Sequence, residues 1–398
     1  MQTVYLDNNA TTLVAPEVLE AMLPYYSELY GNPSSMHAFG GQVGTKISKA
    51  REQVAAGLGA SPEEIVFTSS GTEGDNTAIN AALASMPDKR HVITTRVEHP
   101  AVLNYCKHLK KRGYEVDFLP VDEQGRMDIG RLAAAIRADT AVVSVMYANN
   151  ETGVIFPLED IADIVKSKGV LLHTDAVQAL GKLPFSVADL PVDYLVVSGH
   201  KVHAPKGVGA LYVRKSAPIR PFLIGGHQED GRRGGTENTA SIIGLGKAVE
   251  LATREIAGEI DQVSTLRNKL ENGLLESIPD ARINGDREHR LPNTTSIAFK
   301  YVEGEAMLLM LNEYGICASS GSACTSGSLE PSHVLRAMGV PFTYAHGSLR
   351  FSLSRYTTEE EIDFVLDKLP GIIETLRAMS PFRKEREEFG CSIERDTI

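Results

Sequence analysis

The sequence predicts a two-domain α/β protein with a mainly parallel sheet in the larger domain. The chain has 398 residues, whereas a single hydrophobic core stops growing at about 250–300 residues. Short runs rich in Val and Ile alternate with helical patterns from residue 14 to residue 255, which is typical of parallel strands covered by helices. From residue 256 onward the alternation of strand and helix patterns changes to one typical of a smaller α+β unit.

Six apolar runs are the expected strands of the larger domain, and each is followed by small or polar residues. They span residues 64–67, 91–94, 141–146, 170–173, 193–197 and 209–213. Sheets of this kind bind ligands beyond the carboxyl ends of their strands. We therefore expect functional side chains directly after these runs.

Residues 1–13 and 256–398 are expected to form the smaller domain. Its elements are a charged helix at 259–278, a strand at 294–299, a helix at 304–314, a strand at 348–353 and a last helix. Two overlapping capping boxes, Thr357-x-x-Glu360 and Thr358-x-x-Glu361, mark the start of that helix. The charged residues after Pro381 are expected to be mobile.

The composition fits an enzyme of the cytoplasm. Apolar residues make up 42% and charged residues 23% of the chain, which is ordinary for a globular protein. The net charge of −11 argues against a nucleic-acid partner. No apolar run approaches the ~20 residues that span a bilayer, and the N-terminus lacks the pattern of a signal peptide. We expect no membrane association.

The turn after the first strand is a candidate anion site. It reads Thr68-Ser-Ser-Gly-Thr-Glu-Gly-Asp-Asn76 and precedes an Ala-rich helical stretch. Backbone N–H groups and the helix dipole both favour a phosphate at such a helix start. A plain Gly-Ser turn with a helix cap is the alternative, and the turn lacks the spacing of dinucleotide-binding or Walker loops.

Two later strand ends carry charged side chains. Asp175, in His173-Thr-Asp-Ala-Val-Gln178, is costly to bury unless it meets a positive partner such as a protonated pyridine nitrogen. Lys201, in Ser198-Gly-His-Lys201, suits a covalent bond to a carbonyl cofactor. A capping Asp and a surface Lys are the alternatives. Together with the anion turn, however, the two residues supply the parts that pyridoxal phosphate (PLP) requires.

Other residues near strand ends or in loops are candidates for further roles. His99, in Val97-Glu-His-Pro-Ala101, could stack on a pyridine ring, or be a structural histidine before a proline. The strand 348–353 carries Arg350 and is followed by Arg355; either could bind a carboxylate through two hydrogen bonds or pair with acidic residues of the last helix. Spacing alone leaves the choice open.

Cys324 is a candidate nucleophile. It stands in Ser319-Ser-Gly-Ser-Ala-Cys-Thr-Ser-Gly-Ser328, a run of small residues that cannot build a core and suits an exposed, mobile loop at about 318–332. Cys317 has apolar neighbours and is expected in the core. The four cysteines are widely spaced and are expected to be thiols. No metal site is expected, because no cluster of ligands surrounds them.

These motifs resemble those of the NifS/IscS-type cysteine desulfurases, which belong to the aspartate-aminotransferase-like (fold type I) PLP enzymes. The resemblance runs from Tyr5-Leu-Asp-Asn-Asn-Ala-Thr-Thr12 to Arg355-Tyr-Thr-Thr-Glu-Glu-Glu-Ile-Asp363. The long Cys324 loop is similar to that of the group I enzymes. The residues of these motifs are most similar to those of the nitrogenase-associated NifS branch. Gly74 and Tyr147 depart from the pattern, where Ser and Trp or His are commoner.

The resemblance implies a role for each site residue. Lys201 binds PLP covalently, Asp175 pairs with the pyridine nitrogen, Gln178 contacts the ring hydroxyl and His99 stacks on the ring. The phosphate is held by Gly71, Thr72, Ser198 and His200, with Thr236 reaching in from a second subunit. Asn150 and Arg355 hold the substrate carboxylate, and Cys324 accepts the sulfur and could contact an iron–sulfur cluster transiently.

The implied function is removal of sulfur from L-cysteine, giving L-alanine and a persulfide on the enzyme for iron–sulfur cluster assembly, with nitrogenase as the expected destination. A homodimer and an iron–sulfur scaffold protein are the implied partners. Alternatives are a different PLP reaction, such as that of a selenocysteine lyase or an aminotransferase, and a sulfur-carrying interaction protein. A nicotinamide dehydrogenase is disfavoured, because no strand is followed by G-x-G-x-x-G.

Overall fold

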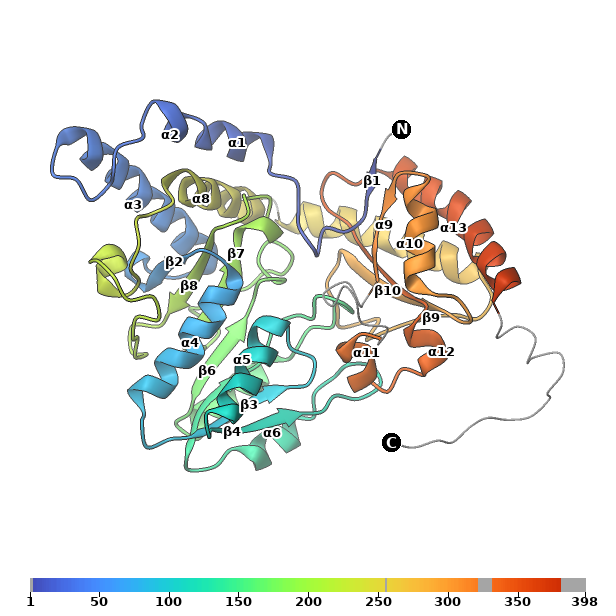
Figure 1. The fold of residues 1–398 in the computed structure, drawn as a ribbon, viewed down its shortest axis with the longest axis horizontal. Helices are drawn as coiled ribbons and strands as arrows, with labels where there is room; N and C mark the ends of the chain where they lie inside the picture. The colour runs from blue at the N-terminus through green and yellow to red at the C-terminus, as the bar shows by residue number, and fades with distance from the viewer. Residues whose placement is uncertain (1–2, 255, 321–330, 381–398) are drawn as a thin grey trace.

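A seven-stranded sheet forms the centre of the larger half of the molecule (Figure 1). The computed structural model describes residues 3–254, 256–320 and 331–380. The strand order is β2-β8-β7-β6-β5-β3-β4, and only β8 runs antiparallel to its neighbours. The strands are β2 (Ile65–Thr68), β3 (His91–Thr95), β4 (Glu115–Leu119), β5 (Thr140–Ser144), β6 (Leu171–Asp175), β7 (Tyr194–Ser198) and β8 (Gly209–Val213).

All six strands expected in this half of the chain are present, and the predicted α/β fold class is confirmed. Strand β4, at the edge of the sheet beside β3, was not among the predicted strands. Glu115 and Asp117 of β4 are exposed. An edge strand keeps part of its side chains in water, so β4 lacks the continuous apolar run that identified the others.

Helices cover both faces of this sheet (Figure 1). They are α1 (Pro16–Met22), α2 (Pro24–Ser27), α3 (Ala38–Leu58), α4 (Gly71–Ser85), α5 (Pro100–Lys111), α6 (Ile129–Ala135), α7 (Leu158–Ser167) and α8 (Thr239–Arg254). Side chains of α1, α3, α7 and α8 share one buried cluster with the sheet, while those of α4 and α5 share another.

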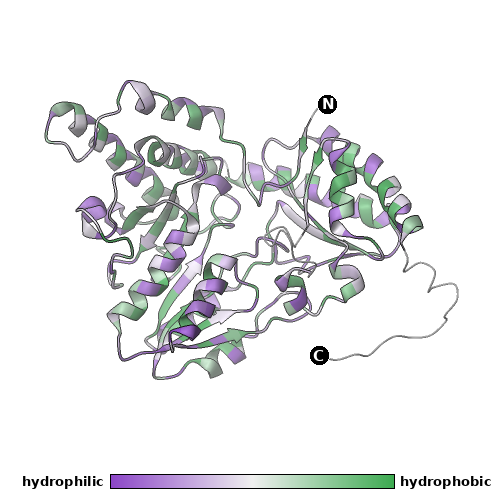
Figure 2. Ribbon diagram, in the orientation of Figure 1, coloured by the Kyte–Doolittle hydropathy of each residue, from purple (hydrophilic) through white to green (hydrophobic). Residues whose placement is uncertain are grey.

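The two clusters follow from the alternation of side chains along each strand. In β7, Leu195 and Val197 join the cluster under α3, α7 and α8, while Tyr194 and Val196 join the cluster under α4 and α5. The helices correspondingly carry alternating bands of hydrophilic and hydrophobic residues (Figure 2). The strands are thus buried on both faces. Functional polar side chains therefore lie at the strand ends.

The smaller half is built on an antiparallel sheet of order β12-β13-β10-β9. Its strands are β9 (Ala281–Ile283), β10 (Thr294–Phe299), β12 (Ser319–Ser320) and β13 (Ser348–Ser352), and α9 (Ile256–Ser277), α10 (Gly304–Asn312) and α13 (Glu359–Met379) accompany it. The short strand β1 (Val4–Tyr5) pairs in parallel with β11 (Ile316–Cys317). Val4 and Leu6 share the hydrophobic core of this half.

The two halves do not divide cleanly along the sequence. The short helices α11 (His333–Ala337) and α12 (Phe342–Ala345) lie between β12 and β13 in the chain. Their side chains Val334, Leu335 and Ala345 belong to the core of the larger half. This segment therefore connects the smaller half to the larger one. None of the helices in the described ranges is long and apolar enough to span a bilayer.

Candidate active site

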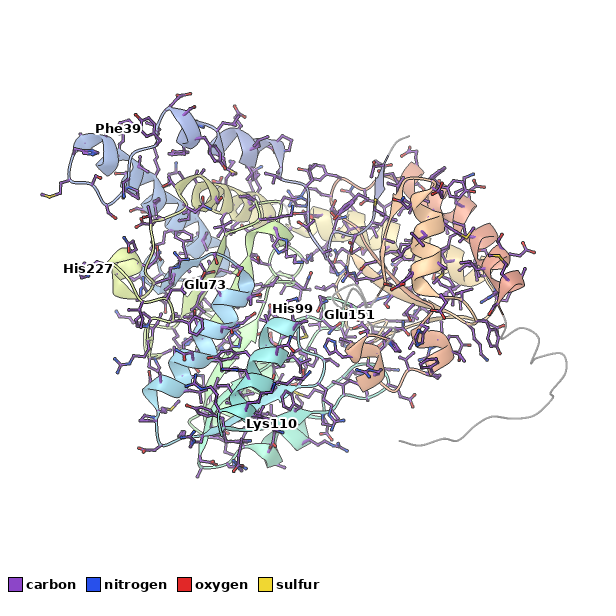
Figure 3. The ribbon with its side chains drawn as sticks, viewed as in Figure 1. Phe39, Glu73, His99, Lys110, Glu151 and His227 are labelled. Carbon is purple, nitrogen blue, oxygen red and sulfur yellow. The ribbon has the colours of Figure 1, made fainter. Side chains whose placement is uncertain are left out.

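A cavity of about 630 Å³ lies where the carboxyl ends of the central strands meet the smaller half of the molecule. His99 from the larger half and Glu151 lie near one another at this junction (Figure 3). The smaller half contributes Arg350 of β13 and both residues of β12, and the N-terminal segment contributes Asp7 and residues 9–11.

Nine of the residues to which the resemblance gives a role line this cavity together. They are Gly71, Thr72, His99, Asn150, Asp175, Gln178, Ser198, His200 and Lys201. They come from the ends of β2, β3, β5, β6 and β7 or from the turns that follow. Because parallel strands bring their carboxyl ends to one edge of a sheet, residues spread over 130 positions of sequence meet at one site.

The anion end of the cavity is the start of α4. Ser70 caps the helix, and its hydroxyl accepts a hydrogen bond from the backbone of Glu73 at 3.2 Å. The first amides of a helix lack partners within the helix, so those of Gly71 and Thr72 are suited to an anion. A side chain at Gly71 would stand 2.8 Å from Cγ2 of Val177, so the close approach here requires glycine.

Glu73, which is acidic, and Gly74, which departs from the family pattern, do not disturb the anion end of the cavity. Glu73 binds Arg233 at 2.9 Å and does not line the cavity. Gly74 packs against β7, since an added side chain would stand 2.8 Å from Cγ1 of Val196. The serine that is commoner at this position would therefore crowd β7 in this chain.

Lys201 follows β7 in a short 3-10 turn, Gly199–Lys201. Its Nζ donates to two backbone carbonyls of the N-terminal segment, those of Asn9 and Ala10, both at 2.6 Å. The neighbouring His200 contacts Oγ1 of Thr11 through Nδ1 at 3.3 Å. Burial, followed by the charge of Lys201, lowers the pKa of His200 to about 4, so its ring is neutral.

Asp175 ends β6 at the floor of the cavity and is 5% exposed. Its Oδ1 accepts the backbone N–H of Val177 at 2.9 Å. Burial raises the pKa of Asp175, while His99, this hydrogen bond and Lys201 oppose the rise. A carboxylate buried in this way gains most from a cationic ligand.

His99 caps helix α5 with its ring. Its Nδ1 accepts the backbone N–H of Ala101 at 3.2 Å. Burial lowers the pKa of His99, Asp175 raises it, and Lys201 lowers it. His99 is therefore both the structural histidine before a proline and a residue of the cavity, because the same ring caps a helix and lines the cavity.

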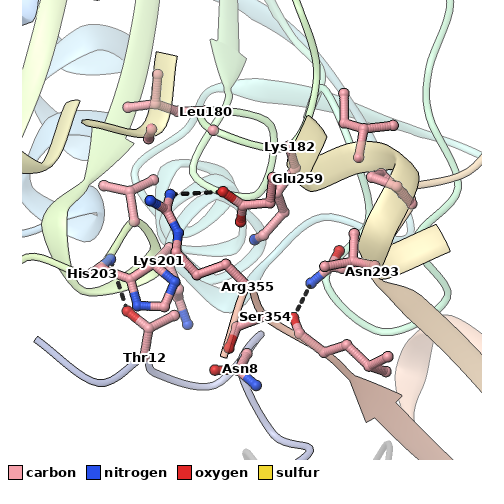
Figure 4. Close-up of a pocket in the computed structure, with 17 residues that line it drawn as sticks. Asn8, Thr12, Leu180, Lys182, Lys201, His203, Glu259, Asn293, Ser354 and Arg355 are labelled. Atoms are coloured by element: carbon pink, nitrogen blue, oxygen red, sulfur yellow. Dashed lines mark hydrogen bonds and ion pairs between the residues drawn. The ribbon is translucent and has the colours of Figure 1, made fainter. Parts of the chain in front are cut away.

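The structure separates the two arginines that spacing could not distinguish. Arg350 lines the cavity, where its guanidinium donates to the backbone oxygen of Asn150 at 2.9 Å and to Asp7 at 2.6 Å. Arg355 lies in an adjoining small cleft and pairs with Glu259 at 2.7 Å (Figure 4). Arg355 does not line the main cavity but lines a cleft that Lys201 also borders. The geometry therefore adds Arg350 as a candidate carboxylate ligand, and the expectation for Arg355 stays a prediction.

Other predicted residues lie elsewhere. Thr236 is exposed and does not line the cavity of its own chain. Cys324 lies outside the described residues. Cys317, expected in the core, is half-buried in β11, and Cys106 is fully buried. No group of residues suited to a metal ion occurs in the described parts of the chain.

Sequence reasoning missed the contribution of the N-terminal segment. The side-chain amide of Asn9 donates a hydrogen bond to Thr294 at 2.8 Å. The backbone oxygen of Asn9 accepts hydrogen bonds from Lys201 and from Gln178. The run of small polar residues 7–12 after a short apolar strand was a visible signal, but its partners are distant in sequence. Glu151 was also missed: it is buried, accepts a hydrogen bond from Ser332, and burial raises its pKa to about 7.

These features fit PLP. The cavity has an anion site at one end, a buried carboxylate on its floor and an amine beside it. A phosphate, a protonated pyridine nitrogen and a carbonyl carbon are the three groups of PLP that such residues would bind. The neutral ring of His99 offers an apolar face over the same space.

Comparison with known proteins places this fold and site in a family. The model of the class-V aminotransferases matches residues 4–365. The chain therefore belongs to the class-V aminotransferase family.

Within this family, the chain is similar to cysteine desulfurases. It is 61% identical over 385 residues to a cysteine desulfurase of Trichormus azollae, covering 97% of this chain and 96% of that one. It is 57% identical over 383 residues to the cysteine desulfurase NifS of Azotobacter vinelandii, covering 96% and 95%. A solved NifS-like protein matches with a TM-score of 0.89 at 44% identity, covering 94% of this chain and all of the other. The predicted family and enzyme class are confirmed.

Proposed function

We propose that this cysteine desulfurase uses PLP bound at Lys201 to take sulfur from L-cysteine and transfers the sulfur to Cys324. The observation that carries the proposal is the meeting of Lys201, Asp175 and the start of α4 in one cavity. PLP bound there supplies an electron sink for the α-carbon of the substrate. Cys324 lies outside the described residues, and its role rests on its loop sequence and on the family.

The residues of the cavity bind and orient the two ligands. The start of α4, with Ser198 and His200, holds the phosphate, and Asp175 binds the pyridine nitrogen. Gln178 donates to the ring hydroxyl. Arg350 and Asn150 hold the substrate carboxylate, since a guanidinium can donate two parallel hydrogen bonds to it.

Lys201 and His99 handle protons in this proposal. Lys201 Nζ lies beside the cavity and would take the proton from the substrate α-carbon. His99 lines the cavity, and the neutral ring that accepts the N–H of Ala101 at Nδ1 carries its own proton on Nε2. To accept the proton of an approaching thiol, Nδ1 would have to leave this backbone N–H. The Cys324 thiolate then attacks the substrate sulfur: an S–S bond forms, the C–S bond breaks, and its electron pair remains with the carbon fragment. That fragment takes up one proton at its β-carbon, regains the α-proton held by Lys201, and leaves as alanine.

We further propose that the enzyme is a cytoplasmic homodimer that passes its sulfur to an iron–sulfur scaffold protein, with nitrogenase as the destination. Five large apolar side chains are exposed at the N-terminal side of the larger half and in the loop near Thr236: Leu13, Tyr26, Tyr30, Met36 and Ile224. Large contiguous apolar patches mark interfaces, and we propose that these side chains form part of one. A second subunit seated there would bring Thr236 towards the neighbouring cavity.

Two substitutions test the proposal. Lys201→Ala should remove the visible absorbance of bound PLP and abolish alanine release from cysteine. Cys324→Ala should keep the PLP absorbance, yet release no sulfide and carry no extra sulfur by mass spectrometry. Cys106→Ala is the matched control, because Cys106 is buried in the core and distant from the chemistry.

The competing PLP reactions give a different pattern. In an aminotransferase, Cys324→Ala would remain fully active, and in a protein that only carries sulfur, Lys201→Ala would still bind its partner and acquire sulfur from another source. Full sulfide production by Cys324→Ala would overturn the assignment of the sulfur-accepting residue.

A further inference from the structure

We propose that Lys182, a second lysine close to the cofactor site, fixes the orientation of the Gln178 side-chain amide and thereby makes that amide a hydrogen-bond donor towards bound PLP. Lys182 is thus a positioning residue rather than a catalytic one. The inference rests on the proposed function, because it assigns a role to Gln178 in binding the cofactor.

Lys182 stands in the turn that follows β6, four residues after Gln178. Its side chain is almost fully buried, at 8% exposed, and Gln178 is 5% exposed. Nζ of Lys182 donates to Oε1 of Gln178 at 2.8 Å. Nε2 of Gln178 donates to the backbone oxygen of Asn9 at 3.0 Å. The amide is therefore held at both ends by partners within the protein.

The chemistry of the two partners selects one orientation of the amide. An ammonium group can only donate, so it requires the oxygen of the amide; a backbone carbonyl can only accept, so it requires the nitrogen. Turning the amide over would set two donors against each other at Lys182 and two acceptors against each other at Asn9. Nε2 has a second N–H, and Gln178 lines the cavity. In this orientation the amide has an N–H donor left for a ligand, while its oxygen is engaged by Lys182.

Lys182 reaches Gln178 from a small cleft on the other side of the cofactor site. The cleft is also lined by Lys201, Glu259 and Arg355 (Figure 4). Burial, followed by the charge of Lys201, lowers the pKa of Lys182 to about 7, and Glu259 acts in the opposite direction. The amine carries N–H donors in either charge state, so the contact with Gln178 can form on both sides of neutral pH. The strict exclusion of the reversed amide belongs to the ammonium form, because a neutral amine also has a lone pair that can accept.

A lysine retained only to fill space or to balance Glu259 would behave differently from one that acts through Gln178. The distinction is measurable with a double-mutant cycle, because residues that act through one another are not additive. Apoprotein of the wild type, Lys182→Met, Gln178→Ala and the double variant is titrated with PLP, and the dissociation constant is read from the visible absorbance or from protein fluorescence.

We expect Lys182→Met to weaken PLP binding about threefold to tenfold, as loss of one oriented hydrogen bond does. In the Gln178→Ala background the same substitution should change the dissociation constant less than about twofold. Lys182→Arg should bind PLP as the wild type does, because a guanidinium also only donates. Lys166→Met is the matched control: Lys166 is a half-buried lysine that pairs with Asp193, directly before β7. Neither residue lines the cavity, so its loss should leave PLP binding unchanged.

Thermal melting of each apoprotein separates folding from binding. The proposal is overturned if Lys182→Met binds PLP as tightly as the wild type, if its loss is equal in both backgrounds, or if Lys182→Arg loses as much affinity as Lys182→Met. If Lys182→Met does not fold, the affinity of Lys182→Arg for PLP still tests the proposal, because the proposal requires it to match the wild type. A wild type that binds no PLP would instead refute the proposed function.

Discussion

Arg350 is the cation that the smaller half of the molecule brings to the cavity. Its guanidinium already donates to Asn150 and Asp7 and is 9% exposed on its side chain. Hydrogen bonds between charged groups are worth roughly 1.5–3 kcal/mol. We therefore expect Arg350→Ala to raise the KM for cysteine about tenfold to a hundredfold, as measured by steady-state alanine release.

Arg355→Ala is the comparison for that experiment. Arg355 pairs with Glu259 in the adjoining cleft, so its loss should lower the melting temperature more than it raises KM. The reverse order of the two KM values would restore Arg355 as the carboxylate ligand, which is what the family resemblance implied.

Glu98, next to His99 in the chain, gives a prediction about pH. It is fully buried; Oε1 accepts hydrogen bonds from Thr95 and from the backbone of Met146, and Oε2 has no hydrogen-bond partner. Burial raises the pKa of Glu98 from 4.5 to about 8. The folded protein therefore holds this proton over a pH range in which the unfolded chain has released it.

The sign of the effect follows from linkage. Between pH 4.5 and 8 the folded state binds more protons at Glu98 than the unfolded state, so this contribution to stability is complete below pH 4.5 and is lost as the pH rises through about 8. Each unit of pKa shift corresponds to about 1.4 kcal/mol, so the loss is a few kcal/mol. Glu98→Gln resembles the protonated acid, and its unfolding free energy should exceed that of the wild type by an increasing margin from pH 5 to pH 8. A constant difference in denaturant unfolding across this range would contradict the prediction.

At the scale of the element, helix α13 depends on its first turn. Of the two overlapping capping boxes in the sequence, the structure forms the one between Thr358 and Glu361, with backbone-to-side-chain hydrogen bonds of 3.0 and 3.3 Å. Thr357 is instead buried, and its hydroxyl accepts the N–H of Ser354. Burial of Thr357 therefore decides which of the two threonines caps the helix.

Thr358→Ala should lower the unfolding free energy by about 1 kcal/mol, the usual cost of losing an N-cap. Thr375→Ala is the matched control within the same helix, since the exposed Thr375 hydroxyl only bonds back to Gly371 and alanine is the better helix former. Urea unfolding of both variants checks the pair, and equal losses would argue against a capping role.

The elements also show where sequence reasoning succeeds and where it stops. Gly71, Asp175 and Lys201 each follow a buried strand, and parallel strands bring such positions together, so their meeting was predictable. Asn9 and Arg350 reach the cavity through contacts between segments hundreds of residues apart. No local pattern encodes such contacts, which is why the backbone acceptors of Lys201 were missed and the arginine was left undecided.

At the scale of the whole molecule, the cavity joins three parts of the chain: the strand ends of the larger half, β12 and β13 of the smaller half, and the N-terminal segment. A ligand that contacts all three stabilises the folded state as a unit, by about 2.7 kcal/mol at a free concentration of one hundred dissociation constants. Removal of PLP should therefore lower the melting temperature, and added PLP should restore it in a concentration-dependent way. A melting temperature independent of PLP would show that PLP does not bind preferentially to the folded protein.

The position of Asn9 between Lys201 and Ser352 also bears on how the enzyme is made. The backbone N–H of Asn9 bonds to Oγ of Ser352, 343 residues later, at 2.8 Å. At about 5–20 residues per second, a ribosome needs roughly 20–70 s to deliver that partner after Asn9 has emerged. The central strands and Lys201 are translated well before then, so the nascent chain can hold a nearly complete large half whose lysine still lacks its anchor. The site that handles sulfur is thus among the last regions to be assembled, and a prematurely terminated chain would not acquire it.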